Sequence, residues 1–324
     1  MNKSNAIAQP KVVAVDDGYV SYDQEISLLS EIGATFEVIP CHGDCQKVIQ
    51  ASKNADVILV RESPMNAAVI DSLVHTKAII RYGIGVDNID MEAAKSRSIY
   101  VANVPDYGIE EVSTHAVMLA LAAMRQVTTH DRLVRSGNWT TGISTPMYRW
   151  RGKTLGLIGY GRIAQMTHQK LSAFGFDRVL VHDPFANLPT HVESASIEEI
   201  CRESDLISLH APLSQSTHHV INAKSLALMK PTCVLVNTAR GGLVDIDALA
   251  IALTEKQILA AGLDVFEQEP PDTKHPLFFL NNVIVTNHIG WYSEESMREL
   301  QYKTAQEAVR VLKGAEPMNW LNKW

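Results

Sequence analysis

The segment LIGYGRIAQ (residues 157–165) places two glycines and an alanine directly after an apolar run. Gly159, Gly161 and Ala164 match the pattern G-x-G-x-x-G/A, and they lie between an expected strand, TLGLI, and an expected helix, RIAQMTHQKLSAF. In such a turn the missing side chains let backbone amides approach a pyrophosphate, and the helix N-terminus adds partial positive charge. A motif of this kind is weak by itself, so the alternative is a tight turn without a ligand.

Asp183 supports the first interpretation. It ends the expected strand RVLVHD, about twenty residues after the turn, where an acidic side chain can accept hydrogen bonds from an adenosine ribose. A carboxylate there repels a ribose 2′-phosphate, and the following residues, HDPFANLP, offer no arginine to bind one. The sequence therefore predicts a dinucleotide site that prefers NAD to NADP.

Short strand patterns alternate with helical patterns on both sides of this segment. Before it, the expected strands are KVVAV, TFEVI, DVILV, AIIRY and IYVAN, with helical patterns at 22–33, 46–53, 66–74 and 91–97. After it come RVLVHDP, DLISLHAPL, TCVLVNTARGG, ILAAGLDVFEQEP and NVIVTNHIG. Such alternation predicts parallel strands joined by right-handed crossovers, with helices on both faces. The fold class is therefore α/β, built from doubly wound parallel sheets.

Two domains are expected, because 324 residues exceed the size at which one hydrophobic core usually stops growing. A long helix, expected at about 109–125, follows the first series of strands, and a last helical pattern at about 293–313 could return to pack on that series. We expect a discontinuous first domain, residues 1–104 plus 292–324, and a second domain, residues 105–291, that binds the dinucleotide.

Composition excludes several classes of partner. The net charge is −7, from 29 basic and 36 acidic residues, and no run of Lys or Arg offers a footprint for nucleic acid or an anionic membrane. No segment reaches the apolar length of a membrane span, and the N-terminus lacks the apolar core of a secretion signal. We therefore expect a cytoplasmic protein that binds neither nucleic acid nor membrane.

Cysteine usage agrees with a reducing compartment, since four cysteines are few for this length. The cluster CHGDC (residues 41–45) lacks a second pair of ligands at zinc-finger spacing, so a surface loop is favoured there and no metal site is predicted.

Three further residues have types suited to hydride-transfer chemistry. Arg240, after the strand TCVLVNTA, could bind a carboxylate with bidentate geometry, or could only stabilise a loop. Glu269 and His288 could form an acid/base pair, because an adjacent carboxylate fixes the tautomer of an imidazole and raises its pKa. Either residue could instead be structural.

Seven blocks, in this order, resemble the D-isomer-specific 2-hydroxyacid dehydrogenases: RYGIGVDNID, VANVPDYGIEEVSTHAV, LGLIGYGRIAQ, LHAPLSQSTHHVIN, NTARGGLVD, LDVFEQEP and NHIGWYSEES. They span about residues 55 to 310. The resemblance implies two Rossmann or flavodoxin-like domains, with the smaller, flavodoxin-like domain at the N-terminus. It also implies that Arg240, Glu269 and His288 are the catalytic triad.

The resemblance implies a mechanism as well. Arg240 and the backbone amides near Ile84 and Gly85 would hold the carboxylate of a 2-oxoacid, while His288 protonates its carbonyl oxygen and NADH supplies the hydride. Besides the glycines and Asp183, the implied cofactor contacts are Arg162, Ile163, His210, Pro212, Thr217, Thr238, Ala239, Asp264 and Gly290. The family also closes its two domains over a small 2-oxoacid or 2-hydroxyacid and forms a homodimer around the helix after VPDYGIEE.

Some positions depart from the commonest family pattern. Asn287 stands where proline often precedes the catalytic histidine, and Ser113 and Thr114 replace residues that are usually alanine and an acid. These differences concern loop stiffness more than chemistry, so the triad assignment stands. Because the sequence continues only briefly after His288, we expect no C-terminal serine-sensing domain of the kind that some phosphoglycerate dehydrogenases have.

RYGIGVDNID and WYSEES are most similar to the branch that includes the C-terminal-binding-protein corepressors and their bacterial dehydrogenase relatives. In that branch the positions of Arg81 and Trp291 face the substrate pocket, where an indole favours a bulkier or apolar oxoacid side chain and an arginine suits a second anionic group. Packing alone could also explain Trp291. The branch leaves a second function open, a dimeric scaffold that senses NADH without turnover.

Overall fold

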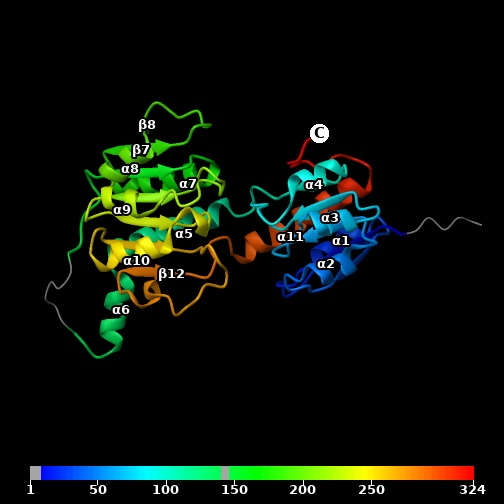
Figure 1. Ribbon diagram of the computed structural model, residues 1–324, viewed down its shortest axis with the longest axis horizontal. Helices are drawn as coiled ribbons and strands as arrows, with labels where there is room; N and C mark the ends of the chain where they lie inside the picture. The colour runs from blue at the N-terminus through cyan, green and yellow to red at the C-terminus, as the bar shows by residue number, and fades with distance from the viewer. Residues whose placement is uncertain (1–8, 140–145) are drawn as a thin grey trace, which may run out of the picture. The chain divides into compact units, whose positions relative to one another are not determined.

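The computed structural model describes residues 9–139 and 146–324. Its contacts divide the chain into two compact units, Met1–Gly108 with Ser293–Trp324 and Ile109–Tyr292 (Figure 1). The expectation about a secretion signal refers partly to residues 1–8, which lie outside the described residues. Within 9–139 and 146–324, no helix is long and apolar enough to cross a membrane.

The first unit is built on a five-stranded parallel sheet. The strand order is β2-β1-β3-β4-β5, the flavodoxin-like order, in which the ends of β1 and β3 flank the reversal of direction. Its elements are β1 (Lys11–Ala14), α1 (Asp23–Ser30), β2 (Thr35–Val38), α2 (Cys45–Ser52), β3 (Val57–Val60), α3 (Ala67–Ser72), β4 (Ala78–Arg81), α4 (Met91–Ser96), β5 (Tyr100–Ala102) and α11 (Glu294–Leu312).

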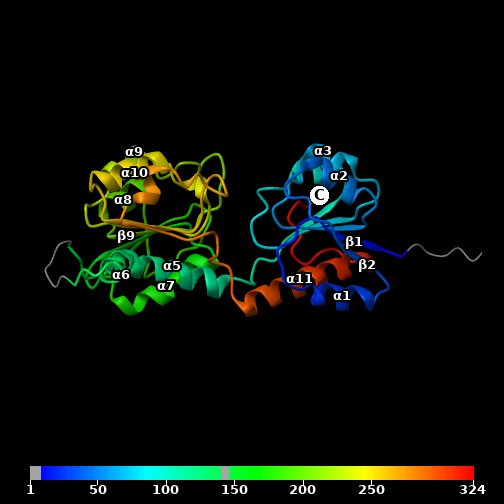
Figure 2. The ribbon, with the colours of Figure 1, turned by 90° about the horizontal axis from the view of Figure 1, so that it is seen from below.

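Helices cover both faces of this sheet, as Figure 2 shows for α2 and α3 on one side and α1 and α11 on the other. Although α11 is formed by the last part of the chain, it packs beside α1. The segment after α11 pairs with β5 through a bridge between Trp320 and Ala102, and the Asn322 side chain accepts a hydrogen bond of 2.8 Å from the Val101 N–H. These contacts make the first unit discontinuous in sequence.

The second unit contains a seven-stranded parallel sheet, and the helices α5 and α6 precede its first strand. The elements are α5 (Ile109–Met124), α6 (Val127–Arg135), β6 (Thr154–Ile158), α7 (Arg162–Leu171), η1 (Ser172–Phe174), β7 (Arg178–His182), β8 (Glu193–Ser194), α8 (Ile197–Glu203), β9 (Leu206–Leu209), α9 (Ala223–Leu228), β10 (Val234–Asn237), η2 (Gly241–Leu243), α10 (Ile246–Thr254), β11 (Ala260–Leu263), η3 (Pro276–Phe279) and β12 (Val283–Val285).

The strand order β12-β11-β10-β9-β6-β7-β8 is the Rossmann order with one added strand. The order reverses between β6 and β9, which pair directly in register from Leu155 and Leu206 onward. In open α/β sheets, ligands bind outside the carboxyl ends of the strands at such a reversal. The glycine turn after β6 lies at this point.

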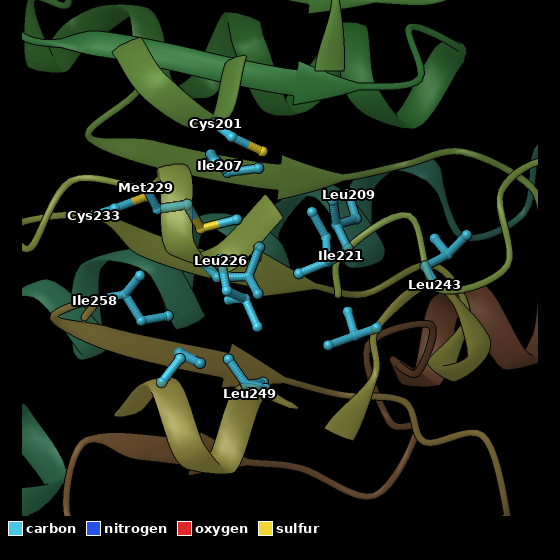
Figure 3. Close-up of a cluster of buried hydrophobic side chains, with 14 of the residues drawn as sticks. Cys201, Ile207, Leu209, Ile221, Leu226, Met229, Cys233, Leu243, Leu249 and Ile258 are labelled. Carbon is cyan, nitrogen blue, oxygen red and sulfur yellow. The ribbon is translucent and has the colours of Figure 1, made fainter. Parts of the chain in front are cut away.

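Two apolar cores enclose the second sheet because alternate residues of each strand point to opposite faces. Leu155, Leu157 and Val236 pack with α5 and α7, whereas Ile207 and Leu235 pack with α8, α9 and α10. Figure 3 shows the second of these cores, in which Leu226 of α9 and Leu249 of α10 lie close to the sheet. Burial on both faces explains why the strands are nearly continuous apolar runs.

The CHGDC segment leads into α2. Cys41 is buried, Asp44 caps the helix by accepting hydrogen bonds from the Gln46 and Lys47 backbone N–H groups, and Cys45 is the first helical residue.

Candidate active site

The turn between β6 and α7 depends on Gly159. Its φ is 91°, a left-handed conformation that glycine adopts without strain. A Cβ there would lie 2.6 Å from the backbone nitrogen of Ala211 and 2.8 Å from the carbonyl oxygen of His210. The segment that follows β9 therefore passes directly beside the turn, and any side chain at residue 159 would collide with it.

Gly161 faces open space instead. No atom lies within 4 Å of a Cβ placed on Gly161, and this residue, the N-cap of α7, supplies no side chain to cap the helix. The first helical turn, which begins with Arg162 and Ile163, therefore presents its N–H groups and the positive end of the helix dipole without a capping side chain. An uncovered helix N-terminus of this kind fits a phosphate group.

Asp183 ties the glycine turn to the end of β7. One of its oxygens accepts a hydrogen bond of 2.7 Å from the Tyr160 N–H, and the other accepts from Phe185 and Ala186 at 2.9 and 3.0 Å. Burial raises the pKa of Asp183, but these three donors outweigh it and hold the pKa below its ordinary value. The group is therefore an ionised carboxylate at neutral pH. Three backbone donors use three of its roughly four acceptor positions, which leaves one for a ligand hydroxyl.

The loop after β9 holds three of the predicted cofactor contacts. His210 Nε2 lies 2.9 Å from Ser208 Oγ, and burial lowers the pKa of this imidazole to about 4, so the ring is neutral at physiological pH. Thr217 donates a hydrogen bond of 2.7 Å to the Pro212 carbonyl oxygen and accepts one from the Ser214 N–H. The hydroxyl of Thr217 thus shapes the loop itself.

The loop after β10 contains an unusual buried hydroxyl. Thr238 is 8% exposed, and its Oγ1 has no hydrogen-bond partner among the described residues. Its neighbour Ala239 donates from its backbone N–H to Asn237 Oδ1 at 3.0 Å, which fixes the turn. Thr238 lies at the carboxyl edge of the sheet, the edge at which the glycine turn also lies. Buried polar atoms are normally paired, so its unpaired hydroxyl is consistent with a ligand group as the partner. Together with Gly161 and Asp183, these residues fit a dinucleotide.

Glu269 and His288 are in direct contact. Glu269 Oε2 lies 2.7 Å from His288 Nδ1, while Glu269 Oε1 accepts a hydrogen bond of 2.9 Å from the Phe266 N–H. Burial raises the pKa of Glu269, but the His288 ring and the Phe266 N–H hold it below its ordinary value, so the group is ionised at neutral pH. An ionised carboxylate at Nδ1 fixes a proton on that nitrogen and leaves Nε2 for chemistry.

Asp264 fixes the backbone that presents this histidine. His288 has a left-handed φ of 55°, and its N–H donates to the Asp264 carbonyl oxygen at 2.7 Å. The Asp264 carboxylate accepts from the N–H groups of Ile289 and Gly290 at 3.0 and 2.9 Å. Burial raises the pKa of Asp264, yet its hydrogen bonds with His115, Thr286 and the backbone of Gly290 and Ile289 lower it to about 2. The Asp264 carboxylate also lies 3.4 Å from His115 Nε2, and the Asp264 N–H donates to the Asn237 carbonyl oxygen at 2.9 Å.

Two residues that sequence patterns did not single out complete this network. Thr286 Oγ1 donates to Asp264 Oδ1 at 2.6 Å and lies 2.9 Å from Nε2 of His115, which comes from α5. His115 and Thr286 are 171 positions apart in the sequence, so no local motif could reveal the pair. His115 does lie in the quoted block VPDYGIEEVSTHAV, but the block assigns it no role.

The loop that holds Arg240 packs against the loop that holds Glu269. A Cβ on Gly241 would fall 1.8 Å from the carbonyl carbon of Phe266, so the two backbones are in contact only because residue 241 is glycine. Arg240 is half-buried, and its Nη1 donates to the carbonyl oxygen of Ala239 at 2.7 Å. The second unit therefore brings all three predicted triad residues to neighbouring loops.

The predicted substrate residues divide between the two units. In the first unit, Arg81 ends β4 and donates from Nη1 to the Tyr82 carbonyl oxygen, and the Ile84 carbonyl oxygen accepts a hydrogen bond of 2.6 Å from Asn103 Nδ2. Gly85 follows in the same loop. In the second unit, the Trp291 ring packs edge-on against Tyr292, with centroids 5.6 Å apart.

Comparison with known proteins agrees with these features. A family model described as D-isomer-specific 2-hydroxyacid dehydrogenase, NAD-binding domain, matches residues 117–290. A D-3-phosphoglycerate dehydrogenase of Methanocaldococcus jannaschii is 38% identical over 310 residues, which cover 93% of this chain and 58% of that protein. A glyoxylate reductase of Thermococcus litoralis is 38% identical over 279 residues, 83% of this chain and 84% of that enzyme. The chain thus spans little more than half of the first relative and most of the second.

Solved structures show the same fold. D-lactate dehydrogenase from Aquifex aeolicus, in complex with NAD and lactic acid, has a TM-score of 0.84 and 28% identity, and the match covers 94% of this chain and 96% of that one. An NADPH-dependent glyoxylate/hydroxypyruvate reductase from Sinorhizobium meliloti, in complex with NADP and malonate, has a TM-score of 0.86 and 25% identity, with 97% of each chain covered. Neighbours of this fold thus include complexes with each of the two dinucleotides.

Proposed function

The chain belongs to the D-isomer-specific 2-hydroxyacid dehydrogenase family, and from that premise we propose that it reduces a small 2-oxoacid to the D-2-hydroxyacid with NADH, and catalyses the reverse reaction. The observation that supports this most directly is the contact of 2.7 Å between Glu269 and His288 in the domain that matches the family model. A paired imidazole and carboxylate is the acid/base device that this reaction needs.

Proton transfer is assigned to His288 Nε2. Because Glu269 holds the proton on Nδ1, Nε2 can donate a proton to the carbonyl oxygen during reduction and accept the hydroxyl proton during oxidation. The ionised Glu269 also fixes the orientation of the ring for this exchange. A bound nicotinamide ring supplies or accepts the hydride. Arg240, whose loop packs against that of Glu269, binds the substrate carboxylate by charge-assisted hydrogen bonds.

The residues that would hold the dinucleotide are those whose local geometry fits it. The open space at Gly161 and the uncapped N-terminus of α7 would receive the pyrophosphate, and Asp183 would accept a ribose hydroxyl. Arg162, Ile163, His210, Pro212, Thr217, Thr238, Ala239, Asp264 and Gly290 complete the proposed set.

We assign NAD rather than NADP from charge. Asp183 is ionised at neutral pH, so a 2′-phosphate beside it would experience direct repulsion. The segment 184–190 that follows contains no Lys or Arg to offset this.

For the substrate, we propose that the backbone amides near Ile84 and Gly85 bind the carboxylate together with Arg240. We propose that Arg81 and Trp291 contact the side chain of the oxoacid. A cationic arginine would favour a second anionic group, whereas the indole of Trp291 would favour an apolar one. The two residues thus favour different oxoacid side chains, one anionic and one apolar.

The chain is further proposed to form a homodimer through the region of α5 and α6. In support, α6 contains no buried residue, and Val127, Leu133 and Val134 on it are 53%, 38% and 51% exposed. Exposed apolar side chains gathered on one helix are typical of an interface.

The test is to follow oxidation of NADH, and separately of NADPH, by the purified protein with glyoxylate, hydroxypyruvate, 3-phosphohydroxypyruvate and larger 2-oxoacids. We expect turnover of at least one oxoacid, faster with NADH. An Asp183→Ser variant should lose part of its preference for NADH. Faster turnover with NADPH would overturn the cofactor assignment. Tight NADH binding without turnover of any oxoacid would instead favour the NADH-sensing scaffold.

A further inference from the structure

Outside the proposed active site, His218, His219 and Glu267 form a compact cluster on the second unit. His218 Nε2 lies 2.9 Å from Glu267 Oε1, and His219 Nε2 lies 3.0 Å from Glu267 Oε2. The two imidazole rings stack on each other, with centroids 3.9 Å apart and planes 22° apart. One ligand atom from each residue lies within 4.8 Å of the other two. The proposed reaction uses none of these three side chains.

The cluster depends on an unfavourable backbone conformation at His219. Consecutive residues in an extended chain point to opposite sides, yet here both rings point to the same carboxylate. This arrangement coincides with a φ of 48° at His219, a left-handed conformation that costs a residue other than glycine about 1 kcal/mol or more. Unfavourable backbone conformations of this kind persist where the surrounding structure enforces them, and they are frequent at functional sites.

Contacts on both sides hold the strained segment in place. The His219 N–H donates to the Gly242 carbonyl oxygen at 2.8 Å, and Asn222 Nδ2 donates to the His219 carbonyl oxygen at 2.8 Å. A parallel bridge between Ile221 and Val244 fixes the next residues. The two histidines are therefore oriented before any ligand arrives, which lowers the entropy that a ligand would have to remove.

The chemistry of the cluster is that of a transition-metal site. Two imidazole nitrogens and one carboxylate oxygen are a ligand set that zinc uses when it keeps a fourth position for water. Tetrahedral coordination at about 2.0–2.1 Å places neighbouring ligand atoms about 3.3 Å apart. The two nitrogen–oxygen separations, 2.9 and 3.0 Å, would therefore widen by only a few tenths of an ångström. Each Nε2 must present its lone pair, which a shift of the neutral ring's proton to Nδ1 allows. All three side chains are between about a third and a half exposed, so an ion and its water can enter.

We propose that His218, His219 and Glu267 bind a divalent transition-metal ion of the zinc class. The ion would join the loop after β9, which contains Pro212 and Thr217, to the loop after β11, which contains Glu269. Local sequence patterns could not predict this site, because His219 and Glu267 are 48 positions apart. The proposal rests on these side chains alone and does not depend on the reaction proposed above.

The test uses the full chain, produced without a histidine tag and dialysed against a chelator. Zinc chloride is titrated by calorimetry, and Co²⁺ is titrated by visible absorption, which reports tetrahedral coordination directly. We expect a single saturable site, a tetrahedral Co²⁺ spectrum and a higher melting temperature with zinc. Glu267→Gln, which keeps the size of the side chain, should weaken the affinity for zinc by about tenfold or more. The double variant His218→Ala with His219→Ala should remove the site.

The matched control is His275→Ala. His275 Nε2 also contacts an acidic residue, Asp247, at 2.9 Å, but that pair lacks a third ligand in the described part of the chain. We expect this variant to bind zinc as the unaltered protein does. Circular dichroism of each metal-free variant confirms that it has folded. The absence of saturable zinc binding, or equal binding by the double variant, would overturn the proposal.

Discussion

His288 shows how much of the candidate site is fixed by single hydrogen bonds. Its left-handed backbone is held by the Asp264 carbonyl oxygen, and its Nδ1 is held by Glu269. The Asp264 carboxylate secures the two residues that follow. Removing the charge at Asp264 should therefore loosen the turn that presents the histidine.

We predict that Asp264→Asn lowers the free energy of unfolding by about 2 kcal/mol near neutral pH. The pKa of Asp264 is about 2 in the folded protein against an ordinary value of 3.8, so its contribution is complete above about pH 4 and is lost as the pH falls towards 2. Urea unfolding of both proteins across this range measures the difference. A difference that does not shrink below about pH 4 would contradict the assigned pKa.

A substitution at Thr238 should weaken NADH binding without lowering the stability of the free protein. Thr238→Val keeps the shape of the side chain and removes a buried hydroxyl that has no partner among the described residues. We expect the free protein to be as stable as before, or more stable by up to about 1 kcal/mol. NADH binding should weaken by roughly threefold to tenfold, the value of one neutral hydrogen bond. Unchanged NADH affinity, measured by fluorescence titration, would show that the hydroxyl does not contact the cofactor.

At the scale of elements, the turn between β6 and α7 contains two glycines with different physical roles. Gly159 is required by the fold, since a Cβ there would meet the backbone after β9, whereas Gly161 faces space that the protein leaves open. The sequence motif treats the two alike. Only the structure separates the glycine that allows the fold from the one that would allow the ligand.

We therefore predict opposite outcomes for the two substitutions. Gly159→Ala should lower the free energy of unfolding by about 2–4 kcal/mol, from its positive φ and the backbone collision. Gly161→Val should change it by less than about 1 kcal/mol but weaken NADH binding by about tenfold to hundredfold. Chemical denaturation and NADH titration of both variants provide the comparison. Strong binding by a well-folded Gly161→Val protein would contradict the proposed pyrophosphate position.

The sequence predicts the helices and strands, but not the contacts between distant residues. Local patterns of apolar residues predict the α/β class, the parallel strands and the position of the glycine turn. Each pattern lies within a single helix or strand, so it can be recognised without the folded chain. The contact of Glu269 with His288 was predictable only as a possibility, because a pattern gives residue types and not distances. The His115–Thr286–Asp264 network and the His218–His219–Glu267 cluster join residues far apart in sequence, so they required the folded chain.

For the whole molecule, the exposed apolar side chains of α6 lead to a prediction about assembly. We expect the purified protein to have twice the mass of one chain by light scattering, and Leu133→Asp with Val134→Asp to shift it towards the monomer. Ile251→Asp, which changes a 57% exposed apolar residue on α10, serves as the control and should leave the mass unchanged. A monomer in the unaltered protein would refute the proposed homodimer.

The central claim is that His288, paired with Glu269, transfers the proton in a dinucleotide-dependent oxoacid reduction. The most direct measurement is the rate of NADH oxidation with the best oxoacid for the unaltered protein, His288→Ala and the control His275→Ala, with NADH affinity measured alongside. We predict that His288→Ala loses about 10²–10⁴ in kcat and still binds NADH, while His275→Ala keeps both properties. If His288→Ala keeps its turnover, or the unaltered protein oxidises no NADH with any oxoacid, the proposed mechanism is wrong.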